Sequence, residues 1–540
     1  MSGRPRRATA ARAAARLVAL VLLAAPARAQ ASGSAAGDAV RYEVAIEGDR
    51  DGAVQRTTAR WRVRATLPHD GAGELDFWLP RWTAGAYHLA EYGEFVDEFA
   101  ARDATSGAPL PVARDGKCRF VIAAGAATSV VVDYVARPCA QGSINQNMIL
   151  SVEGNRIGRD YAFVSPNSLL GFVAGEQDRP CAVRFALPDG WRVASALPAA
   201  DDGTLRASSW WQLEDSPALL GGALETVPFE VDGVPHAFTL GGGDPARAAT
   251  LADHCRRIAE AGRDWMQGLP YANYHFLVQV DPLEQGGAGL EHHDSTLIVI
   301  DPPTASSAEL DHLLAHEYFH LWCAERIHVA ALDRPDYTQP IRTGTIWANE
   351  GITEYFCRHL LVRAGLRTRA QFFAGLAEEG RTARTLWPAA ADRSWSDVSR
   401  EASEWDDFSD LMAFTVKHYQ GGCFTVFALD LEMRAASGGE RGVADLLRYL
   451  HHAHGARGRG YGEEALPAIV AGIAQADLDP FFAAYVDGNE LPKLKERLAV
   501  IGYTVKGGLQ EIVPVPSASF EQSEALEDFF RPPPALRSIR

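Results

Sequence analysis

The chain has 540 residues, of which 47% are hydrophobic and 22% are charged, and this composition excludes a disordered or fibrous protein. Its formal net charge of −17 excludes binding along a phosphate backbone, so no nucleic-acid partner is expected. At roughly 100–200 residues per domain, the length predicts a multidomain protein.

Residues 1–29 have the features of a secretory signal peptide. Five arginines precede an apolar stretch from Leu17 to Ala25, and an Ala27-Arg28-Ala29 cleavage site follows. We therefore expect export, with a soluble mature chain that begins near Gln30 and is periplasmic or extracellular. The apolar stretch is shorter than the about 20 residues that cross a bilayer, and no later segment is longer, so no membrane span is expected.

Residues 30–226 have the pattern of an all-β sandwich. Short runs rich in β-branched and aromatic residues alternate with turn residues, and Trp61, Val63 and Ala65 share one face of a run. These runs are RYEVAIEG (41–48), ARWRVRATLP (59–68), GELDFWLP (73–80), KCRFVIAAG (117–125), TSVVVDYVA (128–136) and CAVRFALP (181–188). The motif LPRWTAGAY (79–87) is expected to be a structural turn at the sandwich edge, with Trp82 and Tyr87 packed inside.

Residues 227–366 are predicted to form an α/β unit. A β segment over 227–239 is followed by a helix within 246–269, then by strands at 275–280 and 296–300 joined by a glycine-rich loop over 284–295. Proline cannot continue a strand ladder, so Asp301-Pro302-Pro303 ends the second strand.

The next helix carries the motif HEYFH, residues 316 to 320. Ser306 and Glu309 have the spacing of a capping box that would start this helix. Its buried stripe is predicted to consist of Leu310, Leu313, Leu314 and Leu321.

Two histidines four residues apart on a helix project from the same side, so His316 and His320 can bind one metal ion. Zinc readily takes neutral imidazole and, in catalytic sites, three protein ligands. Glu317 is placed to accept a proton from water at that site. The alternative is a buried helix whose two histidines are satisfied by hydrogen bonds.

The segment WANEGITEYF (347–356) offers Glu350 as the third ligand on a following helix. Glu354 lies one turn later on the same face, where a carboxylate can accept the free N–H of a zinc-bound imidazole. The alternative for Glu354 is a solvated helix charge. Asp333 and Asp336 are competing ligands, although the loop that bears them is a less rigid mount.

Residues 367–505 are predicted to form a helical domain, interrupted at Pro388 and at Gly438-Gly439. Residues 506–540 are rich in Pro, Ser and Glu and are expected to be a flexible tail.

Several motifs resemble known proteins. HEYFHLW followed by NEGITEYF resembles the thermolysin-related zinc peptidases, and four further segments resemble the glycyl aminopeptidase family of metallopeptidases. These segments are FWLPRWTAGAY (77–87), GGAGLEHHDST (286–296), HYQGGCFTVFALDLEMR (418–434) and FFAAYVDGNELP (481–492). The resemblance covers the chain from about Val40 to Thr504. It implies a thermolysin-like catalytic domain with one Zn²⁺ per chain, bound by His316, His320 and Glu350, and with Glu317 as general base.

The stretch AGLEH (288–292) is similar to the Gly-Ala-Met-Glu-Asn motif of related aminopeptidases, whose glutamate binds the substrate α-amine. The resemblance assigns this role to Glu291, and Gly289 would let the substrate backbone approach closely. A carboxylate at the loop surface is the alternative for Glu291.

Tyr419 matches the tyrosine of a Tyr-x-Lys-Gly pattern, and its phenol could donate to the oxyanion of a tetrahedral intermediate. The chain departs from the pattern with Gly421 at the lysine position. A core tyrosine is the alternative. Many family members also carry a C-terminal PDZ domain, for which the sequence after Gly502 is too short.

Seven cysteines are scattered without C-x-x-C spacing. If the two zinc-bearing helices run antiparallel, as the resemblance implies, Cys323 and Cys357 lie too far apart for a disulfide and are buried thiols.

The sequence thus predicts a zinc aminopeptidase that acts on peptides with a free N-terminus, and the resemblance alone implies a preference for N-terminal glycine or alanine. Two alternatives are a thermolysin-like endopeptidase and a catalytically inactive relative that binds peptides.

Overall fold

The computed structural model describes residues 38–534 except 51–57, 72, 140–150 and 405–407. The signal peptide expected at residues 1–29 lies outside the described residues. Within the described ranges, no helix combines the length and the apolar character that crossing a membrane requires.

The N-terminal part is rich in β-sheet. A seven-stranded sheet has the order β14-β12-β1-β2-β8-β4-β5, in which β1 pairs with β12 in parallel and with β2 antiparallel. Its strands are β1 (Val40–Glu47), β2 (Arg60–Pro68), β4 (Val96–Asp103), β5 (Pro109–Leu110), β8 (Ser129–Ala136), β12 (Cys181–Ala186) and β14 (Leu205–Ala207).

A four-stranded sheet of order β11-β3-β7-β6 shares one hydrophobic core with it. Its strands are β3 (Leu75–Trp78), β6 (Val112–Asp115), β7 (Arg119–Ile122) and β11 (Phe172–Val173). Trp61, Val63 and Ala65 of β2 and Phe77 of β3 are buried in this core, which confirms the predicted alternation. Each of the six β-rich runs overlaps one of these strands.

A third sheet, of order β13-β15-β10-β9, connects the N-terminal part to the centre of the molecule. It comprises β9 (Asn155–Ile157), β10 (Tyr161–Val164), β13 (Arg192–Ala194) and β15 (Ala218–Gly221), and the short helix α1 (Trp210–Glu214) precedes β15. Phe163 and Leu219 of this sheet pack against Leu277 and Leu297 of the central sheet.

The central sheet has five strands in the order β16-β17-β18-β20-β19, namely β16 (Leu224–Val231), β17 (Val234–Gly241), β18 (Tyr274–Val280), β20 (Ser295–Ile300) and β19 (Gly287–His292). Strands β17, β18 and β20 are parallel, and β19 is an antiparallel edge strand. Every residue of β18 and β20 is buried, because helices cover the face opposite the third sheet. The prediction of a loop over 284–295 was wrong, since residues 287–292 pair with β20.

Helices α2 (Ala248–Met266), α4 (Glu309–Phe319) and α5 (Ile346–Arg363) pack on that face. Leu310, Leu314 and Leu321 are buried as predicted, and Leu313 is partly buried. The predicted capping box at Ser306 was wrong. Asp301 instead caps the short helix α3 (Pro302–Ala305), and α4 begins after Ala308 without a side-chain cap.

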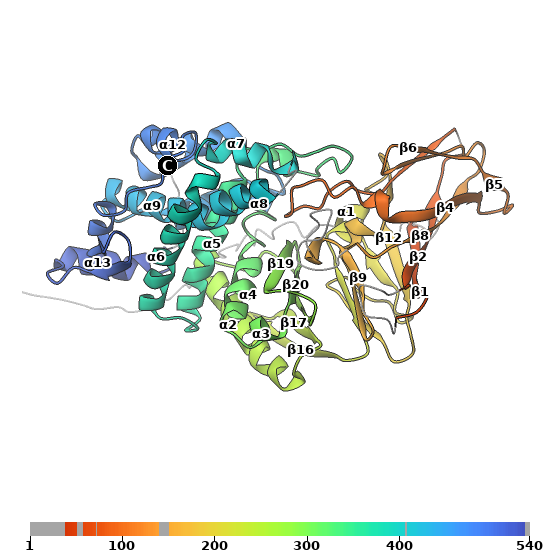
Figure 1. Cartoon of the computed structure of the whole chain (residues 1–540), viewed down its shortest axis with the longest axis horizontal. Helices are drawn as coiled ribbons and strands as arrows, with labels where there is room; N and C mark the ends of the chain where they lie inside the picture. The colour runs from red at the N-terminus through yellow and green to blue at the C-terminus, as the bar shows by residue number, and fades with distance from the viewer. Residues whose placement is uncertain (1–37, 51–57, 72, 140–150, 405–407, 535–540) are drawn as a thin grey trace, which may run out of the picture.

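The C-terminal part is helical and lies at the opposite end of the molecule from the N-terminal sheets (Figure 1). It comprises α6 (Arg369–Leu386), α7 (Trp395–Arg400), α8 (Phe408–Thr415), a π-helical turn (Val416–Gln420), α9 (Gly421–Ala436), α10 (Val443–Ala453), α11 (Leu466–Ala474) and α12 (Asp479–Tyr485). The predicted interruptions are confirmed, since Pro388 lies in a 3₁₀ turn after α6 and Gly438-Gly439 lie between α9 and α10.

The expectation of a flexible tail over residues 506–540 was wrong for residues 506–534, and residues 535–540 lie outside the described residues. Strands β21 (Tyr503–Lys506) and β22 (Glu511–Pro514) form a hairpin, and helix α13 (Phe520–Phe529) follows. Phe529 is fully buried, with its ring centroid 5.1 Å from that of His359 on α5. Apolar burial by these few residues outweighs the polar composition of the segment.

Candidate metal centre

Three ligand atoms from α4 and α5 converge. His316 lies in the last turn of α4 and His320 immediately follows it, and their Nε2 atoms are 3.0 Å apart. Oε2 of Glu350 on α5 lies 3.6 Å from Nε2 of His316 and 3.4 Å from Nε2 of His320. Ligands held tetrahedrally at about 2.0–2.1 Å from a zinc ion lie about 3.3 Å from one another. The three atoms therefore have the spacing of a zinc ligand set.

The electrostatics of this cluster also fit a cation. Oε2 of Glu350 is buried, and it has no hydrogen-bond partner among the described residues. Burial by itself raises the pKa of Glu350, but the imidazoles of His320 and His316 lower it below its usual value. A buried carboxylate oxygen without a hydrogen bond is costly unless a cation compensates it.

The opposite nitrogens of both imidazoles have fixed partners. Nδ1 of His316 lies 2.8 Å from Oε2 of Glu354, and Nδ1 of His320 lies 2.8 Å from the carbonyl oxygen of Cys323. These acceptors place the ring protons on Nδ1, which leaves both Nε2 lone pairs free for a metal. Glu354 is buried and also accepts hydrogen bonds from His312 and Arg358, so it is not a solvated helix charge.

Glu317 is buried beside the two histidines. Burial raises its pKa to about 7, against the opposing effect of both imidazoles. Its carboxyl group packs on β19, where a Cβ at Gly289 would lie only 2.3 Å from Cδ of Glu317. The group that closely approaches the backbone of Gly289 is therefore the Glu317 side chain, where the sequence had suggested a substrate backbone.

Glu291 also lies on β19, and it is buried. Its ligand atom, that of Glu317 and that of His320 all lie within 4.8 Å of one another. A Cβ at Gly85 would lie 2.7 Å from Oε2 of Glu291, so the 79–87 segment of the N-terminal part reaches this carboxylate. Glu291 is therefore part of the cluster and is not a carboxylate at the loop surface.

Tyr419 comes from the π-helical turn between α8 and α9, an irregularity that is frequent at functional sites. Its ring centroid lies 5.9 Å from that of His316. Gly421 stands where the Tyr-x-Lys-Gly pattern has lysine. This difference has a steric reason, because a Cβ at Gly421 would lie 2.4 Å from the ring of Trp395. That ring and Trp387 also pack against the ammonium group of Lys417.

The competing ligands lie outside this cluster, whereas Sγ of Cys357 lies within 4.8 Å of ligand atoms of His316 and Glu354. Asp333 accepts hydrogen bonds from His328 and from the backbone of Gly460, and Asp336 accepts from Thr338. All seven cysteines are buried free thiols, which confirms the prediction for Cys323 and Cys357.

Sequence reasoning missed one aromatic residue at the cluster. Trp82 is buried in the core of the N-terminal sheets, as predicted. Tyr87 is also buried, but it lies outside that core. Tyr87 packs instead with Ile346 and Phe414, and with the half-buried Tyr419. In the sequence, only Gly85 and Tyr87 of the stretch TAGAY indicated that this segment could have a functional role.

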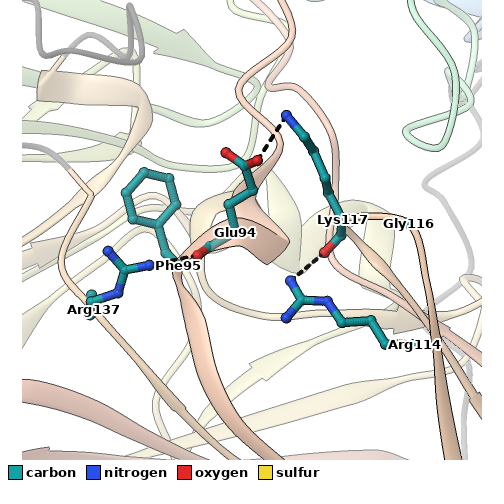
Figure 2. A pocket seen from close by; sticks show the side chains of 6 residues that line it. All are labelled: Glu94, Phe95, Arg114, Gly116, Lys117 and Arg137. Atoms are coloured by element: carbon teal, nitrogen blue, oxygen red, sulfur yellow. Dashed lines mark hydrogen bonds and ion pairs between the residues drawn. The ribbon is translucent and has the colours of Figure 1, made fainter.

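A cavity of about 450 Å³ lies in the N-terminal part, away from these residues (Figure 2). Arg114, Lys117 and Arg137 line it, and each has a partner. Lys117 pairs with Glu94 at 2.8 Å, Arg114 donates to the carbonyl of Lys117, and Arg137 donates to the carbonyl of Glu94. Each of the three basic groups at this pocket thus has a partner within the protein.

Two family models match the chain. One describes the peptidase M61 N-terminal domain and matches residues 53–222, and the other describes the M61 glycyl aminopeptidase and matches residues 309–424. None of the curated proteins compared with the chain matches it.

Solved structures share the fold. An aminopeptidase N family protein from Idiomarina loihiensis is 22% identical, with a TM-score of 0.75 over 86% of this chain and 79% of that one. The M1 zinc metallopeptidase from Deinococcus radiodurans is 15% identical, with a TM-score of 0.53 over 85% of this chain and 95% of that one. A mutant of that enzyme was crystallised with a Tyr-Ser-Ala substrate and is 16% identical, with a TM-score of 0.51 over 85% of this chain and 95% of that one.

Proposed function

Because the chain belongs to the M61 glycyl aminopeptidase family and is a metallopeptidase, we propose that it is a zinc aminopeptidase that removes glycine or alanine from peptide N-termini. The proposal includes a thermolysin-like arrangement of residues 227–366, with edge strand β19 beside α4 and the third ligand on α5. It also includes export directed by residues 1–29 and action in the periplasm or outside the cell.

One observation carries the proposal. The carboxylate of Glu291 lies within 4.8 Å of the ligand atoms of Glu317 and His320. In a peptide, the α-amine is only two bonds from the first carbonyl carbon. A substrate whose ammonium group binds Glu291 therefore presents its first peptide bond to the candidate metal ligands, and an N-terminal extension would remove the amine from Glu291.

His316, His320 and Glu350 would hold the zinc ion, which when bound supplies a Lewis acid that polarises the scissile carbonyl. Glu317 accepts a proton from the attacking water and delivers it to the leaving amine. Its raised pKa suits both transfers near neutral pH. Tyr419 donates its phenol proton in a hydrogen bond to the developing oxyanion.

The test is an assay of purified protein on alanine and glycine anilides, on their N-acetylated forms, and with a chelator. We expect turnover of the free amines, loss of turnover with the chelator, and at least about 100-fold weaker activity on the acetylated forms, because they cannot pair with Glu291. Comparable activity on acetylated substrates would instead favour a thermolysin-like endopeptidase. No turnover of any peptide would favour a peptide-binding relative.

The variant Glu317→Gln separates chemistry from metal binding. We expect kcat to fall about 10²–10⁴-fold, because the proton acceptor is lost while the carbon skeleton is retained. Zinc content should stay at the wild-type value in metal analysis. Wild-type turnover in this variant would contradict the assignment of Glu317 as the base.

A further inference from the structure

The segment that bears Tyr87 is fastened beside the cluster of candidate metal-ligand side chains. The backbone N–H of Arg81 donates to the carbonyl of Tyr337 at 2.9 Å, and the indole N–H of Trp82 donates to the carbonyl of Gln339 at 2.8 Å. A tight turn follows, in which Ala86 and Tyr87 both donate to the carbonyl of Thr83. The segment is thus fastened to the 336–339 loop before it reaches Glu291.

Tyr87 has an unusual conformation for a tyrosine. Its φ is 63°, in the left-handed region that a bulky residue rarely adopts, and its side chain is only 1% exposed. Strain of this kind persists where the surroundings impose it, and it concentrates at active sites and ligand clamps.

The direction of the side chain follows from its neighbours. Gly85, two residues earlier, touches Glu291, and the Tyr87 ring packs on Ile346, one turn before Glu350. The phenol lies within electrostatic range of the carboxylates of both Glu291 and Glu350. Tyr87 therefore lies near both the carboxylate proposed to bind the amine and the carboxylate proposed to bind the metal.

The first residue of a bound substrate must lie beside the same two carboxylates, because its Cα joins the amine to the scissile carbonyl. We propose that Tyr87 sets the size of the N-terminal residue that the enzyme accepts, by filling the space into which a larger side chain would extend. This inference rests on the proposed aminopeptidase function. Phe414 and Tyr419 belong to the same apolar cluster as Tyr87.

The test compares kcat/KM for alanine and leucine anilides in the wild type and in Tyr87→Gly, a substitution that the positive φ favours. We expect the leucine-to-alanine ratio to rise at least about tenfold, the order that a few methylenes contribute in an apolar pocket. Tyr87→Phe keeps the ring and should leave the ratio within about threefold of the wild type. Phe520→Ala, at a side chain that is 73% exposed on α13, should leave the ratio unchanged.

An unchanged ratio in a folded, zinc-loaded Tyr87→Gly variant would overturn the proposal. If the wild-type enzyme had a higher kcat/KM for the leucine anilide than for the alanine anilide, the proposed role of Tyr87 would also be overturned. The proposed aminopeptidase function would still stand. If the wild type cleaves no unblocked anilide, the proposed function fails instead. Binding of alanine and leucine hydroxamates, measured by calorimetry, then decides the role of Tyr87, because the same change in ratio is expected without turnover.

Discussion

At the scale of single residues, Glu354 connects the candidate metal ligand His316 to a wider network of charged side chains. Its carboxylate accepts from His316 and His312, and from Arg358, which also pairs with Glu379. A carboxylate with this many donors is held in one orientation, and it holds the His316 ring in turn.

Loss of this charge should weaken metal binding. For Glu354→Gln we expect zinc affinity to fall about 10–100-fold, because the ring of His316 loses its charged acceptor. Competition with a chromogenic chelator measures this affinity. Glu378→Gln, at an exposed position of α6, is the matched control and should bind zinc as the wild type does. Equal affinities in the two variants would show that Glu354 does not support the site.

At the scale of elements, the site depends on how closely β19 approaches α4. Gly289 makes this approach possible, because any Cβ would overlap the carboxyl group of Glu317. The edge strand, which also carries Glu291, thereby places the proposed amine site beside the proposed base.

The variant Gly289→Ala should push strand β19 and helix α4 apart. We expect kcat to fall at least about 100-fold while zinc stays bound, since a displacement of the base by about 1 Å has an effect of this size. Steady-state kinetics with metal analysis measures both quantities. Gly472→Ala in α11, where a Cβ would meet open space, is the control and should leave kcat unchanged.

The C-terminal helix α13 is a second element whose packing can be measured. Phe529 is buried among Phe372, Phe373 and Phe427, so Phe529→Ala should lower the free energy of unfolding by about 3–5 kcal/mol. Phe520 on the same helix is 73% exposed, and Phe520→Ala should change it by less than about 0.5 kcal/mol. Denaturant unfolding distinguishes the two. A cost below about 1 kcal/mol for Phe529→Ala would mean that α13 contributes little to stability.

At the scale of the whole molecule, buried polar contacts hold the N-terminal sheets against the central sheet. Arg156 pairs with Asp281 at this interface, and both side chains are 1% exposed. His275 of β18 lies there as well, with Nε2 2.7 Å from Oγ1 of Thr239 and Nδ1 3.2 Å from the carbonyl of Ser195. Charged and polar groups buried in this way require a fixed domain arrangement.

The interface should weaken in acid. Burial lowers the pKa of His275 to about 4, so between about pH 6.5 and 4 the unfolded chain binds a proton that the folded chain does not. Stability is therefore fully present above about pH 6.5 and falls as the pH drops, by up to about 3 kcal/mol from this residue. We expect His275→Gln to reduce the pH dependence of the Tm of the zinc-loaded protein over this range. His452→Gln, at an exposed position, should not change it.

The limits of sequence reasoning are clearest at β19, at α13 and at Tyr87. The glycines of β19 are typical of a loop, and only pairing with β20 makes residues 287–292 a strand. The polar composition of the last segment concealed Phe529, whose burial depends on side chains contributed by α5, α6 and α9. Tyr87 was expected inside its own domain, yet it packs on α5 and α8.

The sequence by itself determined the local features of this protein. The spacing of His316, Glu317 and His320 predicted the helix that carries the candidate metal ligands, and alternating apolar residues predicted the first strands, because both patterns depend on the period of a single element. Only the tertiary structure decided which distant groups meet: Gly85 with Glu291, Gly289 with Glu317, and Tyr87 with the cluster of Ile346 and Phe414. Contacts of this kind depend on how separate elements pack, which no local period encodes.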